Sequence, residues 1–324
     1  MLPYLAFIYT DYYGQHKLVY LTDIYMKKYK LVSGNRTLDL STPKVMGILN
    51  VTPDSFSDGG THNKPNAAYD FAAQMCRDGA TIIDIGGEST RPGAALVSTE
   101  EELERVIPVV ERISKGLDVF ISVDTSKPEV MAQAAEAGAH LINDIRALKV
   151  EGALEVCAKA NIPVCLMHMQ GEPQNMQDAP QYKDLLGDVN EFFFERIHEC
   201  LNAGIKRENI IIDPGLGFGK TLDQNYELLG RLETFKSFDL PMLIGLSRKS
   251  MIGNLLNVPV SERMVGSVAL ALYSIMKGAN IVRVHDVKET VQAITCWEKA
   301  QSFEHSAPEL KKIIKLGHDS KSSN

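Results

Sequence analysis

Short apolar runs rich in β-branched residues recur along the chain, and stretches with helical periodicity follow most of them. There are eight such runs: Val45–Asn50, Thr81–Gly86, Val119–Asp124, Leu141–Ile145, Val164–Met169, Ile210–Asp213, Met242–Ser247 and Ile281–His285. Nearly continuous apolar strands that alternate with helices are typical of a parallel sheet covered by helices. Eight strand–helix units favour an α/β fold made of a single (β/α)8 TIM barrel, which takes roughly 250 residues. The alternative is an open α/β sheet in which one of the eight strands is wrongly assigned.

Two of the predicted helices carry clear end signals. After Asp124, Ser126 is expected to cap a helix that has Pro128 in its first turn and Gly138 near its end. The segment Ser261–Lys277 predicts a long helix that stops at Gly278, because glycine readily adopts the left-handed conformation found after helix C-termini.

Both ends of the chain lie outside the predicted barrel, to which we assign residues 30–305. Residues 1–29 are a short tyrosine-rich N-terminal extension, and Met26 is a candidate start of translation that would make the preceding residues non-native or disordered. Residues 306–324 are polar and rich in lysine and predict a solvated tail. The apolar stretch Leu2–Tyr9 is too short to span a bilayer and lacks preceding basic residues, so a cytoplasmic location without membrane attachment is expected.

Composition narrows the classes of partner. The net charge of −7 argues against a broad surface for nucleic acid or anionic membrane, so any bound anion must meet a local cluster of positive groups. The chain has five scattered cysteines and no Cys-x-x-Cys pair. This pattern is typical of free thiols in a reducing compartment and disfavours a disulfide framework or a zinc site.

Polar residues occur at the carboxyl ends of most of the predicted strands, where TIM barrels hold their active sites. In chain order they are Asn50, Asp84, Asp124, Asn143, Asp213, Ser247, Arg283 and His285. Two further segments rich in polar residues, 86–93 and 247–250, follow the second and seventh strands. So many polar groups at one end of a barrel predict a ring around a single mouth.

Arg283 and His285 are two residues apart on a predicted strand. Their side chains should therefore share one face, with Val284 directed oppositely into the helix layer. An arginine beside a histidine suits a diphosphate, because guanidinium binds oxyanions through two parallel hydrogen bonds. The alternative is a structural ion pair between Arg283 and Asp286 or another carboxylate.

Asp124, Asn143 and Asp213 bring two carboxylates and a carboxamide from three different strands. Carboxylates inside a barrel mouth are costly unless something pairs with them. A divalent metal would serve, and so would a flat heterocycle rich in N–H donors. In the alternative interpretation each caps the amides of a neighbouring loop, which is less favoured for three such residues together with Lys249.

The segment 215–221 ends like a nucleotide-binding P-loop. The position five before Gly219 is Pro214, however, so the required glycine spacing fails. We predict a flexible loop after the sixth strand that exposes Phe218 to the mouth.

Two long motifs resemble signatures of a known enzyme family. The segment Met46–Gly60 is similar to the first-strand signature of dihydropteroate synthases, and Asp84–Gly93 is similar to their second signature. The residues around Asp124, Asn143, Asp213, 247–250 and 283–285 also match in order and approximate spacing, so that the resemblance covers about residues 30–300.

The resemblance implies a TIM barrel that condenses 7,8-dihydropterin-6-ylmethyl diphosphate with 4-aminobenzoate and releases diphosphate. It places Asp124, Asn143, Asp213, Lys249 and Met167 at the pterin, and Thr90, Arg283 and His285 at the diphosphate. Arg91, Pro92, Phe218, Ser247 and Ser250 would surround 4-aminobenzoate, with Asp58 and Arg91 on mobile loops, and Asn50 would bind Mg²⁺. A homodimer and a sulfonamide-sensitive 4-aminobenzoate site are implied as well.

Physical chemistry is consistent with these roles. Carboxylates and a carboxamide complement the aminopyrimidinone edge of a pterin. Mg²⁺ retains waters and bridges phosphates, so one protein ligand can suffice. Two alternatives are a corrinoid-dependent pterin methyltransferase, which would lack the diphosphate site, and a paralogue that binds pterin without turnover.

Overall fold

The computed structural model describes residues 6–10, 16–20, 29–52, 64–88, 97–171, 176 and 180–304. Their central element is an eight-stranded parallel sheet with the order β10-β9-β8-β7-β6-β5-β12-β11. A parallel bridge between Ile212 and Met242 joins the two outer strands and closes the sheet into a barrel. The predicted TIM barrel is thus confirmed, and the open-sheet alternative is wrong.

The barrel strands lie close to the predicted runs. They are β5 (Lys44–Asn50), β6 (Ile82–Gly86), β7 (Phe120–Asp124), β8 (Leu141–Asp144), β9 (Val164–Met167), β10 (Ile210–Asp213), β11 (Leu243–Gly245) and β12 (Ile281–Val284). Every strand follows its chain predecessor around the barrel, which is the arrangement that short right-handed strand–helix–strand connections produce.

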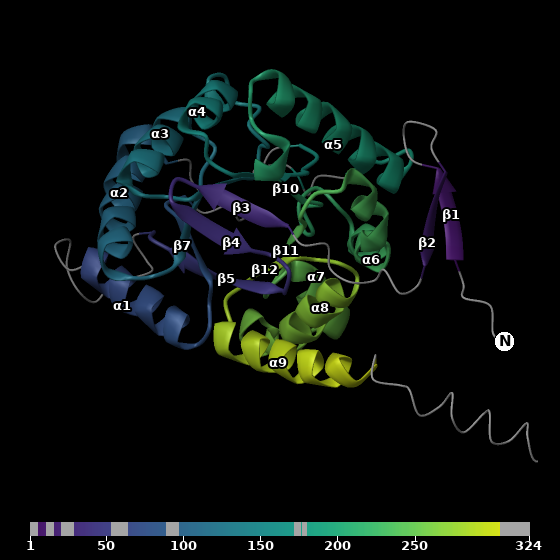
Figure 1. Cartoon of the computed structure of the whole chain (residues 1–324). Coiled ribbons are helices and arrows are strands. Elements are labelled where there is room, and N and C mark those ends of the chain that lie inside the picture. The colour runs from purple at the N-terminus through teal and green to yellow at the C-terminus, as the bar shows by residue number, and fades with distance from the viewer. Residues whose placement is uncertain are drawn as a thin grey trace, which may run out of the picture.

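Helices surround these strands (Figure 1). The α-helices are α1 (Lys64–Arg77), α2 (Thr99–Gly116), α3 (Pro128–Ala137), α4 (Ala153–Ala160), α5 (Leu185–Asn202), α6 (Leu222–Gly230), α7 (Ser250–Leu256), α8 (Met264–Met276) and α9 (Val287–Glu304). Three short 3-10 helices accompany them: η3 (Arg207–Asn209), η4 (Leu232–Phe238) and η5 (Val260–Glu262).

The helix-end predictions are confirmed in part. α3 ends at Gly138, whose φ of 108° is left-handed, but Ser126 does not cap its start. The Ser126 hydroxyl instead donates to Asp144, which holds the loop after β7 against β8. α8 begins at Met264, three residues later than predicted, because the residues before it form the separate turn η5.

One residue from each barrel strand builds an apolar floor inside the barrel. This floor layer consists of Met46, Ile82, Phe120, Leu141, Cys165, Ile211, Leu243 and Ile281. The hairpin of β3 (Lys30–Ser33) and β4 (Arg36–Asp39) crosses this end of the barrel (Figure 1). Its buried side chains Leu31 and Leu38, with Leu40 after it, pack against the floor and keep water from it.

The alternate strand residues face outward and pack against the helices in one large core, as β geometry requires. Val284 belongs to this core, which confirms its predicted direction into the helix layer.

Near the N-terminus, β1 (Ala6–Thr10) and β2 (His16–Tyr20) pair in a separate antiparallel sheet. The start of translation at Met26 stays a prediction, and the tail 306–324 lies outside the described residues. Within the described ranges, the helices are too short or too polar to cross a bilayer.

Candidate active site

Above the apolar floor, the inward positions become polar. Residues two positions beyond the floor layer face the same interior because strand side chains alternate. This second layer consists of Ile48, Asp84, Ser122, Asn143, Met167, Asp213, Gly245 and Arg283. Another two positions along, at the rim, lie Asn50, Gly86, Asp124, Ser247 and His285. The predicted ring of polar groups at one mouth is therefore confirmed, and it is stacked in two levels.

Arg283 lies between two carboxylates at the centre of this mouth. Its Nε lies 2.5 Å from Asp84 Oδ2 and its Nη2 lies 2.8 Å from Asp124 Oδ2. The guanidinium thus reaches from β12 to β6 and β7. Burial opposes the charge of Arg283, but the two carboxylates outweigh it and raise the pKa of this group above its ordinary value. Of the alternative ion pairs, the one with Asp286 is wrong, because Asp286 accepts a 3.0 Å bond from Arg248 Nε, whereas pairing with other carboxylates is confirmed by the contacts with Asp84 and Asp124.

Asp124 is the most strongly shifted carboxyl group at the mouth. Burial raises its pKa to about 7, and the neighbouring carboxylates of Asp84 and Asp144 act in the same direction, against the opposing charge of Arg283. A ligand that donates hydrogen bonds or carries positive charge would stabilise the ionised form of Asp124, and this form would in turn strengthen binding of the ligand.

Asp213 and Lys249 form the opposite side of the second layer. Asp213 Oδ1 accepts a 2.8 Å hydrogen bond from Gly215 N, and burial raises the pKa of this carboxyl group. Burial lowers the pKa of Lys249 to about 8, against the attraction of Asp213. The Lys249 ammonium donates to the carbonyl of Leu216 and lies 4.4 Å from the centroid of the Phe218 ring.

The loop after β10 differs from its prediction. Phe218 is only 9% exposed and packs with Met167 and Ile145, so the expected exposure of its ring is wrong. Lys220 holds the loop: its Nζ donates to the carbonyls of Gly215 and Phe218, each at 2.9 Å, and contacts His168 Nδ1 at 3.0 Å. The sequence does not show that Lys220 holds this loop, because the positions of the atoms it contacts depend on the folded loop.

The loop after β11 is tied to β12. Ser247 Oγ lies 3.0 Å from His285 Nδ1 and accepts a 3.1 Å bond from His285 N. Arg248 has a φ of 57° and binds Asp286, so the turn that places Lys249 is fixed on both sides. Ser250 is exposed and begins α7.

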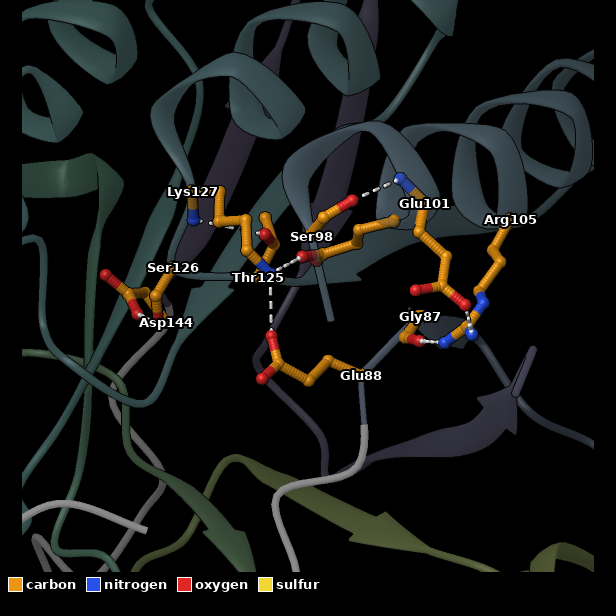
Figure 2. A network of polar contacts seen from close by, with 10 residues as sticks. Gly87, Glu88, Ser98, Glu101, Arg105, Thr125, Ser126, Lys127 and Asp144 are labelled. Carbon is orange, nitrogen blue, oxygen red and sulfur yellow. Dashed lines mark hydrogen bonds and ion pairs between the residues drawn. The ribbon is translucent and has the colours of Figure 1, made fainter. Parts of the chain in front are cut away.

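Four predicted site residues, Asp58, Thr90, Arg91 and Pro92, lie outside the described residues. A polar network holds Gly87 and Glu88, the described residues that precede Thr90, Arg91 and Pro92 (Figure 2). Lys127 Nζ binds Glu88 Oε2 at 2.7 Å and also pairs with Glu102, which is only 1% exposed. Arg105 Nη1 donates to the carbonyl of Gly87 at 2.9 Å.

Sequence reasoning placed Asp84 among the polar strand ends at the mouth without a specific role, and it assigned no role to Lys127 or Lys220. For Asp84 a signal existed: it stands two residues beyond Ile82, so its strand parity directs a carboxylate into the barrel. The partners of Lys127 are distant in sequence, and so is His168, which Lys220 contacts; no local pattern points to these pairings.

Among the described residues, no group of three His, Cys, Asp or Glu side chains could hold a metal ion. Asn50 is exposed at the end of β5. A Cβ built on Gly86 would lie 3.9 Å from both Asn50 Oδ1 and Asp124 Oδ2. One exposed amide oxygen near the mouth suits a cation that takes most of its ligands from water and phosphate.

Comparison with known proteins gives consistent matches. The family model described as "Pterin binding enzyme" matches residues 46–285. The chain is 60% identical over 273 residues to dihydropteroate synthase of Escherichia coli K12, covering 84% of this chain and 97% of that protein. It is 53% identical over 269 residues to the Haemophilus influenzae enzyme of the same name, covering 83% and 98%.

Solved structures agree with these matches. The Yersinia pestis dihydropteroate synthase with a sulfonamide drug complex is 58% identical, with a TM-score of 0.80, covering 84% of this chain and 99% of that one. The Xanthomonas albilineans dihydropteroate synthase with 4-aminobenzoic acid is 48% identical, also with a TM-score of 0.80, covering 85% and 99%.

Proposed function

The chain belongs to the pterin-binding enzyme family, among the dihydropteroate synthases, and on this premise we infer which reaction it catalyses and which residues carry it. The reaction is the transfer of a pterinylmethyl group from (7,8-dihydropterin-6-yl)methyl diphosphate to 4-aminobenzoate, giving 7,8-dihydropteroate and diphosphate for folate synthesis. The substrates are small molecules. The single observation that supports the site best is the two-level polar mouth, in which carboxylates, a carboxamide and cationic groups face one opening.

We propose that the pterin lies against the second layer. Asp124, Asn143 and Asp213 would accept hydrogen bonds from its ring N–H and amino groups, and Lys249 would donate to its carbonyl. Met167, 4% exposed, would pack on the ring face. Pairing with the ligand would offset the cost of burying these charges.

We propose that Arg283 and His285, with Thr90, bind the diphosphate. In the reaction the methylene C–O bond breaks and its electron pair leaves with the diphosphate, where Arg283 and His285 stabilise the growing negative charge. The Asp124 carboxylate stabilises the cation-like methylene that remains. The neutral amine of 4-aminobenzoate then forms the C–N bond and loses a proton, so no strong general base is needed.

We propose Mg²⁺ as the cofactor, with Asn50 Oδ1 as its protein ligand. When bound, the ion supplies further positive charge to the diphosphate oxygens. The support is the amide oxygen of Asn50 at the exposed end of β5, close to the Gly86 position at the mouth.

We propose that 4-aminobenzoate lies at the outer side of the mouth, among Phe218, Ser247, Ser250 and the segments that carry Asp58, Arg91 and Pro92. Ser247 is 6% exposed and Ser250 is exposed at the start of α7, so the two lie at different depths along one entry side. Sulfonamides resemble 4-aminobenzoate and would compete for this position.

We propose a cytoplasmic homodimer. Apolar side chains of α8 and the end of α7 are exposed: Val265 is 73% exposed, Leu255 57% and Met276 53%. A second copy of the chain would cover this surface. Five scattered cysteines without a disulfide framework suit a reducing compartment.

The decisive experiment incubates the purified chain with pterin diphosphate, Mg²⁺ and 4-aminobenzoate and follows dihydropteroate and diphosphate. Formation of both products in equal amounts is expected. Pterin binding without turnover would indicate a silent paralogue. Methyl transfer from methyltetrahydrofolate to a corrinoid, without release of diphosphate, would indicate the methyltransferase alternative.

A further inference from the structure

Asp84 is a fully buried carboxylate in the second layer, beneath the proposed pterin position. Its exposed fraction is 0%, and in register it lies between Ile48 of β5 and Ser122 of β7. One oxygen, Oδ2, accepts both from Arg283 Nε at 2.5 Å and from Asn143 Nδ2 at 3.2 Å. The other oxygen, Oδ1, makes no hydrogen bond within the described chain. Burying a carboxylate here costs free energy, which its bonds to Arg283 and Asn143 must offset.

The bond to Arg283 determines how the guanidinium is presented. Arginine offers five N–H donors in a planar fork. Asp84 takes the Nε edge and Asp124 takes Nη2, which leaves Nη1 for a ligand. Because β5 lies between β12 and β6, the Arg283 side chain must cross the barrel interior to reach Asp84. Without that anchor, the long side chain could turn toward solvent at the rim.

The bond to Asn143 determines which end of its carboxamide faces the ligand. A carboxylate can only accept, so Asn143 must direct its NH₂ group to Asp84. Its carbonyl oxygen is then available to accept from a ligand N–H. An uncharged amide at position 84 could donate instead, and Asn143 could then bind in the flipped orientation.

We propose that Asp84 is a positioning residue of the synthase reaction, which fixes the direction of Arg283 and the amide orientation of Asn143 while remaining beneath the substrate. This inference rests on the proposed pterin and diphosphate sites. It extends them by one residue that affects the binding of pterin diphosphate and not the binding of 4-aminobenzoate.

The test compares Asp84→Asn with Asp223→Asn. Asp223 is exposed in the first turn of α6, away from the mouth, so the second variant makes the same chemical change outside the site. Hydrogen bonds to charged groups predict that Asp84→Asn lowers kcat/KM for pterin diphosphate by about 10- to 100-fold. The KM for 4-aminobenzoate should change by less than about twofold, and Asp223→Asn should leave both constants close to those of the wild type.

A double-mutant cycle with Arg283→Lys separates positioning from general disruption. If Asp84 acts through Arg283, Asp84→Asn should cost clearly less in the Arg283→Lys background than in the wild type. An equal loss in both backgrounds would overturn the proposal, as would normal kcat/KM in a folded Asp84→Asn enzyme. An inactive wild type would refute the proposed function itself, which is a separate outcome.

If Asp84→Asn does not fold, the wild type still decides. NMR of ¹⁵N-arginine-labelled protein should show a slowly exchanging Arg283 Nε–H in the ligand-free state, assigned by its absence in Arg283→Lys. Rapid exchange of this proton would contradict the anchor.

Discussion

At the residue scale, the mouth of the barrel concentrates ionisable groups whose charged forms burial disfavours. The pKa of Asp124 and Asp213 is raised and that of Lys249 is lowered, in each case mainly by burial. Burial thus disfavours the charged forms of both acids and of the base, and a ligand with complementary donors and acceptors would stabilise those forms. The site is thus prepared for a polar, flat ligand and costs stability without one.

Asp213→Asn is expected to weaken pterin binding by about 100-fold, because a charge-assisted hydrogen bond to the ring is lost and a new donor faces it. Isothermal titration with a pterin ligand measures the effect. Asp223→Asn, at an exposed position of α6, is the matched control and should bind normally. Near-normal pterin affinity of Asp213→Asn, with an unchanged melting temperature, would contradict the assigned role.

His168 predicts a pH dependence of stability. Burial, aided by Lys220, lowers its pKa from 6.5 to about 2. Between pH 6.5 and about pH 2, His168 is therefore protonated in the unfolded chain and neutral in the folded chain. Its contribution to the free energy of unfolding is fully present above pH 6.5 and is lost as the pH falls. One such group removes about 2 kcal/mol between pH 7 and pH 5.

Urea unfolding of wild type and His168→Asn at these two pH values checks this. The asparagine can still accept from Lys220 but does not titrate, so the variant should lose less stability on acidification. The raised carboxyl pKa values act with the opposite sign in both proteins, and the difference between the two proteins isolates His168. Equal losses would argue against a neutral buried His168.

At the element scale, the loops after the strands are fixed by bonds to neighbouring strands and helices. Three glycines of the loop after β10, Gly215, Gly217 and Gly219, have positive φ values of 69°, 84° and 60°. The loop lies so close to the end of β9 that side chains at two of these positions would collide with backbone atoms. The loop is a rigid wall of the mouth, and Lys220 fastens it from below.

Gly215→Ala should destabilise the fold by about 3 kcal/mol or more, because its Cβ would lie 1.8 Å from the His168 carbonyl oxygen and its φ is 69°. Gly230→Ala is the control: nothing lies within 4 Å of its Cβ, and stability should change by less than about 1 kcal/mol. Chemical denaturation measures both. Normal stability of Gly215→Ala would show that the loop shifts to accommodate the added methyl group.

Lys127→Met should destabilise the protein by about 3–5 kcal/mol, because Glu102 would remain buried without its cation. Adding Glu102→Gln should recover part of the loss by removing that charge. Urea unfolding of the single and double variants measures this recovery. A double variant no more stable than Lys127→Met would show that the ion pair is not the source of the effect.

At the scale of the whole molecule, the barrel separates stability from chemistry along its axis. The floor layer and the hairpin of β3 and β4 form an apolar end, whereas the opposite end carries the polar groups. The interior of the barrel is thus apolar at one end, and the charged residues gather at the other, where the ligand is proposed to bind. On the outer surface, exposed apolar side chains occur along α8 and at the end of α7.

Val265→Glu should convert the proposed dimer into a monomer, since it places a charge on a side chain that is 73% exposed within this apolar area. Sedimentation equilibrium gives the mass. Phe71→Glu changes a comparable side chain, 46% exposed on α1, and should leave the mass unchanged. A wild type that sediments as a monomer would refute the proposal directly.

The sequence by itself determined the eight strands, their inward and outward faces, and the gathering of Asn50, Asp124, Asn143, Asp213 and Arg283 at one mouth. These follow from local periodicity and from the rule that parallel strands end together, so the chain order suffices. The tertiary structure decided which groups meet: Arg283 binds Asp84 and Asp124, not Asp286, and Phe218 is buried under Lys249. Such pairings depend on strand register and on distances across the barrel, and neither is encoded in neighbouring residues.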